Sequence, residues 1–253
     1  MLWIHVLRGV DMKYVPLSPF GRVIMISGAN RGIGRAIAEC LHQEGYSLSL
    51  GARHLESLAA LTDVLEASRV FPHTYEACDA LSPIAWVKAT VERFGRLDGL
   101  VNNAGVLYRF GVEDEDESRL DEMWEVNTKG PLRLIRAAFP HLKACGAGRV
   151  VNILSLSGKR VVASWVAGYC MSKFATSALT HAVRYAGWDH GVRATAICPN
   201  IVATDMITDF ADLPPEKMIH PGVVAQLVAT VLTLPNPTSV VEIPINCRLE
   251  HSV

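Results

Sequence analysis

The stretch that decides the fold reads Ser27-Gly28-Ala29-Asn30-Arg31-Gly32-Ile33-Gly34, between an apolar run and a segment of helical periodicity. Gly28 permits a tight turn, Gly32 lets the backbone approach a ligand, and Gly34 lets the following helix pack close to the preceding strand. The first turn of that helix would offer unpaired N–H groups and a partial positive charge. Because the stretch joins a strand to a helix, it predicts the phosphate-binding turn of a dinucleotide site.

The rest of the chain alternates between short apolar runs and helical patterns. Seven strands are predicted, at Arg22–Ser27, Tyr46–Leu50, Val70–Ala77, Leu97–Val101, Arg149–Ser155, Val192–Cys198 and Val240–Ile245. Six helices are predicted, at Gly32–Glu44, Leu55–Ala67, Pro83–Phe94, Leu120–Leu142, Val166–Asp189 and Gly222–Leu232. Several apolar runs lack a polar face, which is typical of parallel strands covered by helices on both sides. The alternation predicts one doubly wound α/β domain of Rossmann type, with a seven-stranded parallel sheet and helices on both faces.

Two segments fall outside this alternation. Residues 1–20 precede the first strand and are predicted to form an N-terminal arm, so that a single domain covers residues 21–253. The segment from Thr204 to Pro221 contains three prolines and joins the sixth strand to the last helix. Because ligands of open α/β sheets bind beyond the carboxyl ends of the strands, this segment is a candidate lid.

Composition excludes several classes of protein. The chain has 253 residues, and 24 basic against 25 acidic side chains give a net charge of −1. A chain of this length buries enough surface to need no disulfide or metal. A near-zero charge gives no general attraction for nucleic acid, so no nucleic-acid partner is expected. The six cysteines and nine histidines are dispersed without a C-x-x-C or H-E-x-x-H sequence, so neither disulfides nor a metal site are expected.

No targeting or membrane segment is predicted. The apolar amino end is interrupted by Arg8, Asp11 and Lys13 and has no basic stretch before it, unlike a secretory signal. The longest apolar stretch, Gly222 to Leu234, is too short to span a bilayer. We therefore expect a cytoplasmic protein without a membrane partner.

Three further motifs lie near predicted strand ends. Asn102-Asn103-Ala104-Gly105 follows the fourth strand, and the fifth strand ends at Ser155. Tyr169-Cys170-Met171-Ser172-Lys173 places a tyrosine and a lysine four residues apart, on one face of a predicted helix. The glycine spacing is G-x-x-x-G-x-G, which differs from the usual dinucleotide pattern G-x-G-x-x-G. From about Val23 to Ile245 the chain thus resembles the short-chain dehydrogenase/reductase superfamily, whose members carry these motifs.

The tyrosine and the lysine suit acid–base chemistry. A free tyrosine has a pKa near 10, so a proton shuttle near pH 7 needs its phenolate favoured by about 4 kcal/mol. A nearby ammonium and the positive nicotinamide ring of an oxidised cofactor would act in that direction. The resemblance implies that Tyr169 is the general acid/base, that Ser155 hydrogen bonds the substrate carbonyl, and that Lys173 contacts the ribose hydroxyls and Tyr169. It also implies that Asn127 holds a water in a proton relay.

Two serines could be the one that hydrogen bonds the substrate carbonyl. Ser155 and Tyr169 are 14 residues apart (169 − 155), one more than is usual in the family. Ser157 is therefore a rival, although the Asn-Ile-x-Ser register of the strand favours Ser155.

The glycine turn and the resemblance together assign residues to a dinucleotide cofactor. They are Gly28, Asn30, Arg31, Gly32, Ile33, Gly34, Arg53, Asp79, Asn103, Ala104, Gly105, Tyr169, Lys173, Pro199, Val202 and Thr204. Asp79 would bind the adenine amino group, although capping of the next helix is the competing interpretation. Val202 and Thr204 would contact the nicotinamide carboxamide. Asn200 stands where the family has glycine, and asparagine tolerates a left-handed backbone better than most residues.

Two arginines and a missing acid favour NADP over NAD. The second strand ends in the sequence Leu50-Gly51-Ala52-Arg53, and Ala52 stands in the place where a carboxylate would bind the 2′-hydroxyl of NAD. Arg53 can make charge-assisted contacts to a 2′-phosphate, and Arg31 in the glycine turn can approach the same group. The alternative for either arginine is a solvated surface charge.

These observations predict an oxidoreductase that transfers a hydride between NADP(H) and a small alcohol or carbonyl substrate. One alternative is a non-catalytic NADP sensor or scaffold on the same fold. Another is a sugar-nucleotide epimerase or dehydratase, whose substrate domain needs more chain than the region after Thr204 offers. The sequence does not identify the substrate; Arg109 and Arg160 could bind an acid or merely face water. From the resemblance we expect a homodimer or homotetramer in which the helices after Leu120 and Val166 pack against another subunit.

Overall fold

Seven parallel strands form one sheet in the order β3-β2-β1-β4-β5-β6-β7. The computed structural model describes residues 15–161, 163–207, 210 and 213–249. The strands are β1 (Val23–Ser27), β2 (Ser47–Ala52), β3 (Val70–Thr74), β4 (Gly99–Asn102), β5 (Arg149–Ile153), β6 (Arg193–Pro199) and β7 (Glu242–Ile245). The predicted fold class, a doubly wound α/β sheet, is confirmed.

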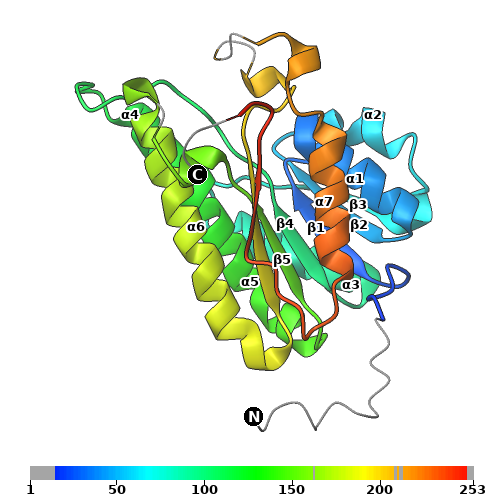
Figure 1. Cartoon of the computed structure of the whole chain (residues 1–253). Coiled ribbons are helices and arrows are strands. Elements are labelled where there is room, and N and C mark those ends of the chain that lie inside the picture. The colour runs from blue at the N-terminus through cyan, green and yellow to red at the C-terminus, as the bar shows by residue number, and fades with distance from the viewer. Residues whose placement is uncertain (1–14, 162, 208–209, 211–212, 250–253) are drawn as a thin grey trace, which may run out of the picture.

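Helices cover both faces of the sheet (Figure 1). They are α1 (Gly32–Glu44), α2 (Ala59–Thr62), α3 (Ser82–Phe94), α4 (Ser118–Trp124), α5 (Gly130–Ala144), α6 (Ala167–Gly187) and α7 (Pro221–Thr233). The apolar faces of α1 and α7 form one core with the sheet, and α3, α5 and α6 form a second core on the opposite face. Because both faces are covered, every residue of β1, β5 and β6 is buried.

The predicted helix Leu120–Leu142 is wrong as a single helix. It consists of α4, a π-helical turn η3 (Glu125–Lys129) and α5. Pro131 near the start of α5 has no N–H to give the carbonyl of Asn127, and the hydroxyl of Thr176 donates to that carbonyl instead, at 2.7 Å. The helical pattern continues through the interruption, so periodicity alone could not reveal it.

The predicted helix Leu55–Ala67 is also shorter than expected. A 3₁₀ turn η1 (Leu55–Leu58) leads into α2, and a second 3₁₀ turn η2 (Ala67–Arg69) precedes β3. The hydroxyls of Ser57 and Thr62 donate to backbone carbonyls three residues earlier. Such side-chain bonds compete with the regular helical ladder.

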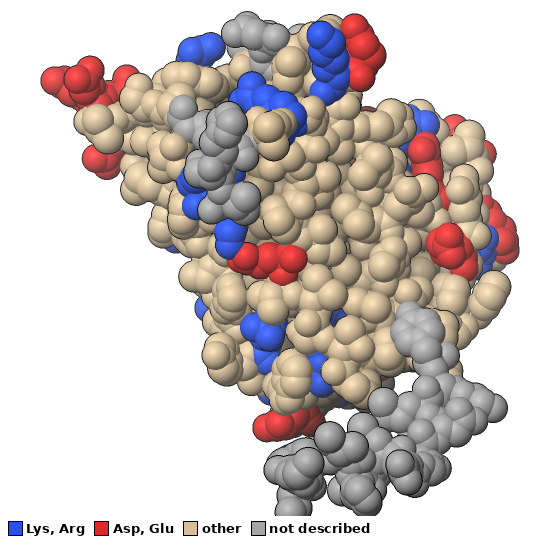
Figure 2. All heavy atoms as spheres, in the orientation of Figure 1, with Lys and Arg blue, Asp and Glu red and all other residues tan. Residues whose placement is uncertain are grey.

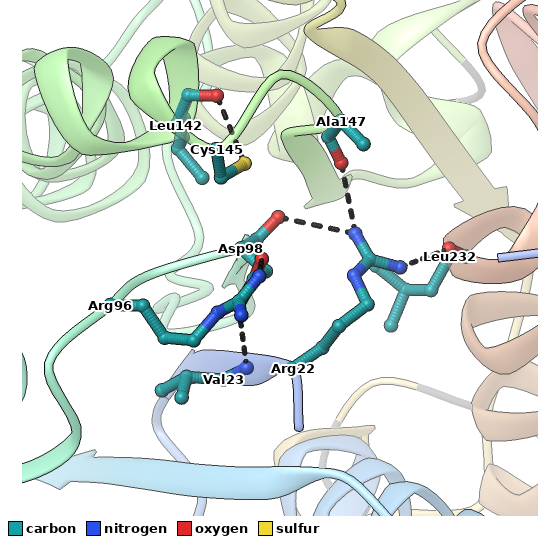
Figure 3. A network of polar contacts seen from close by, with 8 residues as sticks. All are labelled: Arg22, Val23, Arg96, Asp98, Leu142, Cys145, Ala147 and Leu232. Carbon is teal, nitrogen blue, oxygen red and sulfur yellow. Dashed lines mark hydrogen bonds and ion pairs between the residues drawn. The ribbon is translucent and has the colours of Figure 1, made fainter. Parts of the chain in front are cut away.

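A polar network joins segments at the amino edge of the sheet (Figure 3). The guanidinium of Arg22 donates to the carbonyls of Leu232 at 2.8 Å, Ala147 at 2.9 Å and Asp98 at 3.4 Å. The Asp98 carboxylate accepts from the Val23 N–H at 2.9 Å and from the guanidinium of Arg96 at 2.6 Å. The network therefore links β1 to α7 and to the loops before β4 and β5.

The two segments outside the alternation are partly described. The N–H of Leu17 donates to Thr233 at the end of α7, and the ring of Phe20 lies against Gly45 after α1. The rest of the predicted arm, residues 1–14, lies outside the described residues. After β6, the chain forms 3₁₀ turns at Asp205–Ile207 and Pro215–Lys217 before α7, above the carboxyl edge in Figure 1.

Charged side chains lie mainly around the periphery of the face shown in Figure 2, while its middle carries few. None of the helices in the described part of the chain has the length and hydropathy that a membrane crossing needs. Among the described residues, no group of three or more His, Cys, Asp or Glu side chains could hold a metal ion.

Candidate active site

A cavity of about 500 Å³ opens at the carboxyl edge of the sheet. Its walls come from the glycine turn, the ends of several strands, α4, α6 and the segment after β6. The predicted residues that line it are Gly28, Asn30, Arg31, Gly32, Ile33, Arg53, Asn103, Ala104, Gly105, Tyr169, Lys173 and Thr204. Residues from distant parts of the chain thus meet where doubly wound sheets bind ligands.

The glycine turn has the geometry of a phosphate cradle. Gly28 and Gly32 have φ angles of +65° and +52°, in the left-handed region that favours glycine. A Cβ on Gly34 would lie 2.1 Å from the carbonyl oxygen of Gly28, so no other residue fits there. Arg31 at the N-cap of α1 makes no side-chain capping bond, so the first N–H groups of α1 are open to a ligand. The turn therefore fits the pyrophosphate of a dinucleotide.

Two asparagines tie the strand ends beneath this turn. The register of β4 and β5 places Asn102 opposite Asn152, and the Nδ2 of Asn102 donates to the Oδ1 of Asn152 at 2.8 Å. The Nδ2 of Asn103 donates to the carbonyls of Ser27 and Gly28, both at 3.0 Å. The Asn103 side chain thus holds the glycine turn, and Asn103, a predicted cofactor residue, also lines the cavity.

Tyr169 and Lys173 lie one turn apart on α6, and both line the cavity. The Nζ of Lys173 is 5.6 Å from the centroid of the Tyr169 ring and donates to the carbonyl of Ile153 at 3.1 Å. Ser155 follows β5, and its hydroxyl hydrogen bonds with that of Tyr169. The structure therefore brings Ser155 next to Tyr169, which lines the cavity together with Lys173.

Burial dominates the electrostatics of this group. It raises the pKa of Tyr169 to about 12, although the hydrogen bond with Ser155 acts in the opposite direction. Burial also lowers the pKa of Lys173 to about 8, so the lysine stays mostly protonated at neutral pH. The expected preference for the phenolate therefore does not arise from the surroundings of Tyr169 in the protein alone.

Ser155, and not Ser157, is the serine beside the tyrosine. The Ser155 hydroxyl hydrogen bonds with Tyr169 and also accepts from the backbone N–H of Ser157 at 3.1 Å. Burial raises the pKa of the Cys170 thiol, and a hydrogen bond from Ser157 to that thiol lowers it. Ser157 thus faces Cys170.

Asn127 occupies the π-helical turn and is almost fully buried. Its Nδ2 donates to the carbonyl of Val106 at 2.9 Å and to the hydroxyl of Ser172 at 3.1 Å. Its Oδ1 accepts from the Val106 N–H at 2.9 Å. The side chain holds the loop after β4 against α6, and the role of Asn127 in a water relay stays a prediction.

A family model described as short chain dehydrogenase matches residues 22–213, which include the glycine turn and the Tyr169–Lys173 motif. The chain belongs to the short-chain dehydrogenase family. It is therefore an oxidoreductase with a Rossmann-type nucleotide-binding fold.

Several proteins are similar to this short-chain dehydrogenase. An agropine synthesis reductase from Rhizobium rhizogenes is 42% identical over 254 residues, which cover 98% of this chain but only 57% of that relative. The chain thus spans little more than half of that relative's length. The structure of an alcohol dehydrogenase from Thermococcus sibiricus, in complex with 5-hydroxy-NADP, has a TM-score of 0.83 and 32% identity, covering 91% of this chain and 99% of that one. A metagenomic short-chain oxidoreductase in complex with NADP has a TM-score of 0.79 and 29% identity, covering 92% of this chain and 100% of that one.

At the adenosine end of this short-chain dehydrogenase, Ala52 and Arg53 line the cavity where an acid would select NAD. Arg53 is exposed, and the part of the chain that the structure describes offers it no ion pair. Arg31 lies 3.5 Å from the carboxylate of Asp205, and both side chains are exposed. Arg31 therefore has a competing partner within the protein, which its place in the sequence did not reveal.

Four predicted cofactor residues do not line the cavity: Gly34, Asp79, Pro199 and Val202. Gly34 acts through its close contact with Gly28, as described above. The Asp79 carboxylate accepts a hydrogen bond from the Leu81 N–H at 2.9 Å in the loop before α3. Leu81 is the N-cap residue of α3, and this helix has no side-chain capping bond, so the competing interpretation of Asp79 as a cap is not confirmed. Ala77 and Cys78 line the cavity beside it instead.

Asn200 does not adopt the left-handed backbone considered for it. No non-glycine residue among those described has a positive φ angle. The N–H of Asn200 donates to Ile245 at 2.8 Å and its Nδ2 to Asn246 at 3.1 Å, so the turn is held against β7. The methyl of Thr204 lies 3.1 Å from where a Cβ of Gly32 would be, which brings the segment after β6 to the glycine turn.

Some residues that line the cavity were not predicted from the sequence. His54 and Ser57 lie at the 3₁₀ turn after Arg53, and Glu122 and Val126 face the cavity from α4 and the π-helical turn. Ser57 could have been found from its place just after Arg53, because the start of a helical turn offers N–H groups to anions. Nothing in the periodicity marks Glu122, because its contact with the cavity depends on how α4 lies against the carboxyl edge of the sheet.

Proposed function

We propose that this short-chain dehydrogenase transfers a hydride between NADP(H) and a small alcohol or carbonyl substrate. The observation that carries the proposal is the placement of Tyr169 and Lys173 at the wall of a cavity that also contains the glycine turn, with Ser155 next to Tyr169. A dinucleotide whose pyrophosphate lies on the turn would extend along this cavity toward Tyr169. When bound, the nicotinamide donates or accepts the hydride.

The side chains of this site would manage the proton and the charge on the substrate oxygen. In the reductive direction Tyr169 donates its hydroxyl proton to the carbonyl oxygen as that oxygen becomes negative. Ser155 donates a hydrogen bond to the same oxygen and stabilises its developing charge. The high pKa of Tyr169 keeps the hydroxyl protonated at neutral pH, which is the form that reduction needs.

Lys173 would stabilise the phenolate of Tyr169 and hold the cofactor ribose. Its ammonium is buried, bonded to the carbonyl of Ile153 and 5.6 Å from the Tyr169 ring. A positive charge at this distance favours the phenolate that remains after proton transfer. The same group can donate to ribose hydroxyls of the cofactor, because it carries three donors and only one protein acceptor is shown for it.

NADP rather than NAD is proposed from the adenosine end of the cavity. A 2′-phosphate there would meet the guanidinium of Arg53 and the hydroxyl of Ser57, and Ala52 offers no repelling carboxylate. Arg31 would exchange Asp205 for the phosphate. The two solved relatives described above are complexes with NADP or a derivative of it, which supports the same choice.

Fluorescence titration with NADPH and NADH, followed by turnover of a panel of aldehydes, ketones and alcohols, tests the proposal. NADPH should bind more tightly than NADH, and wild type should turn over at least one carbonyl that Tyr169→Phe does not. Binding of NADPH without turnover of any carbonyl or alcohol, unchanged in Tyr169→Phe, would instead identify the non-catalytic sensor.

We also propose that two or more copies associate through the outer face of α5 and α6. Met171 and Phe174 on α6 are 50% and 43% exposed, and Leu132 on α5 and Tyr185 on α6 are exposed as well. Large apolar side chains grouped on one face favour association. A molar mass from light scattering that equals one chain at micromolar concentration would refute this.

A further inference from the structure

Three side chains from three different loops form a stacked cluster at the carboxyl edge of the sheet. The rings of Trp165 and Phe210 are stacked, with centroids 5.7 Å apart and an interplanar angle of 15°. The guanidinium of Arg109 lies 4.7 Å from the Trp165 ring and 5.6 Å from the Phe210 ring. Arg109 comes from the loop after β4, Trp165 from the 3₁₀ turn before α6, and Phe210 from the segment after β6.

Backbone bonds hold this cluster next to the reacting group. The N–H of Phe110 donates to the carbonyl of Trp165 at 2.9 Å, and the N–H of Gly168 donates to the carbonyl of Phe110 at 3.2 Å. Trp165 therefore lies one turn before Tyr169, clamped to the loop that carries Arg109. Phe210 is bonded to Ile207, in the same segment as the cavity residue Met206. The cluster is thus connected to Tyr169 through α6 and to the cavity through Met206.

The charge of Arg109 has no counter-charge in the part of the chain that the structure describes. Arg109 is exposed, and no carboxylate of those residues forms an ion pair with it. Arg119 offers a contrast, because it lies 4.4 Å from the Tyr108 ring and also pairs with Glu122 at 3.5 Å. A guanidinium held against aromatic rings keeps its in-plane N–H groups available, and their fork matches a carboxylate.

We propose that Arg109 binds a carboxylate of the substrate, so that the protein acts on oxo acids and hydroxy acids. This inference rests on the proposed function and adds the substrate class. The stacked rings fix the guanidinium, which reduces the side-chain entropy lost when the acid binds. The apolar surface of Trp165 and Phe210 would face the carbon chain between the carboxylate and the reacting carbonyl.

Matched oxo acids and their methyl esters test the proposal, with the carbonyl two to five carbons along the chain and NADPH as the reductant. Wild type should show a higher kcat/KM for the acid than for the ester at one preferred chain length. Arg109→Gln should lower kcat/KM for that acid by about 10- to 100-fold, because a hydrogen bond to a charged group is lost. The same variant should change kcat/KM for the ester by less than about twofold, and Arg109→Lys should keep part of the preference.

Two controls separate recognition from folding. Arg93 also lies on an aromatic ring, 5.0 Å from the Phe94 centroid, but at the end of α3, so Arg93→Gln should leave the acid-to-ester ratio unchanged. Quenching of tryptophan fluorescence by an unreactive carboxylate such as pentanoate should be stronger than quenching by its methyl ester, and should be lost in Arg109→Gln but retained in Arg93→Gln.

The outcomes distinguish this inference from the proposed function. Equal turnover of acids and esters by wild type, or an equal loss for both in Arg109→Gln, would overturn the role of Arg109 and leave the proposed function standing. Turnover of neither acids, esters nor any other carbonyl would overturn the proposed function itself.

Discussion

Arginines lie at both edges of the sheet, and the two groups differ in what they bind. At the amino edge Arg22, Arg149 and Arg193 are only 7%, 3% and 8% exposed. Their guanidiniums donate to main-chain carbonyls, such as Leu232 for Arg22, Leu234 for Arg149 and Trp188 for Arg193. At the carboxyl edge Arg53 and Arg109 are exposed, and the described residues give neither of them an ion pair.

The difference indicates that the amino-edge arginines stabilise the fold, and it is consistent with the proposed ligand-binding role of the carboxyl edge. Several amino-edge carbonyls belong to the ends of α7 and α6, where the helical ladder leaves them without donors. Burial lowers the pKa of Arg149 to about 10, with Arg22 and Arg193 adding to the effect, so closely grouped charges need several carbonyls each. Within the described part of the chain, Arg53 and Arg109 have no such bonds, which is why we propose that they receive anionic groups.

The largest expected effect concerns the reacting group at the carboxyl edge. Tyr169→Phe removes the proton donor but keeps the ring, so kcat should fall by about 1,000-fold with any carbonyl substrate. The Kd for NADPH, from fluorescence titration, should change by less than about threefold. A kcat within tenfold of wild type would remove Tyr169 from the mechanism.

At the amino edge a comparable change should affect stability and leave chemistry intact. Asp98→Ala leaves the buried Val23 N–H without its acceptor and Arg96 without its ion pair, so the free energy of unfolding should fall by about 3 kcal/mol. Urea unfolding measures this, and kcat of the folded variant should match wild type. Glu39→Ala, which removes an exposed pair with Arg35, should cost less than about 0.5 kcal/mol. Equal costs for the two variants would contradict the distinction.

A smaller effect should separate the two cofactors at Arg53. Arg53→Gln removes the charge that would face a 2′-phosphate, so the Kd for NADPH should rise by about 10- to 50-fold. The Kd for NADH should stay within about twofold, because NADH has no such phosphate. An equal weakening of both cofactors would mean that Arg53 shapes the cavity without selecting NADP.

The smallest effect is a dependence of stability on pH. Burial lowers the pKa of Lys173 to about 8, below its usual value of 10.5, so the unfolded chain binds more protons between these values. The cost of the buried charge is fully present below pH 8 and is relieved as the pH rises. Between pH 8 and 9 the free energy of unfolding of wild type should gain about 1 kcal/mol relative to Lys173→Met.

Wild type must be compared with Lys173→Met because the titration of other groups lowers the free energy of unfolding as the pH rises. Burial raises the pKa of Tyr169 to about 12 and of Cys198 to about 11, so the folded chain binds more protons than the unfolded chain at high pH. Lys88→Met, at an exposed site, should follow wild type. Parallel curves for wild type and Lys173→Met would show that the lysine is not buried as a cation.

Much of this arrangement could be predicted because it depends on local patterns. Helix α1 begins and ends where the periodicity after the glycine turn placed it, Gly32–Glu44. Burial of both sheet faces makes strands such as β5 continuously apolar, and such runs are visible in sequence. The residues Tyr169 and Lys173 could be placed on one helix face because positions i and i+4 always share one.

The sequence by itself therefore determined the doubly wound fold, the glycine turn and the family to which the chain belongs, since each depends on the spacing of residues close together in the chain. Only the tertiary structure decided which partners meet across long separations. It paired Arg31 with Asp205, turned Asn127 toward Val106 through a π-helical turn, and stacked Arg109 on Trp165 and Phe210. Such contacts depend on where loops end in space, and the spacing of residues along the chain does not contain that information.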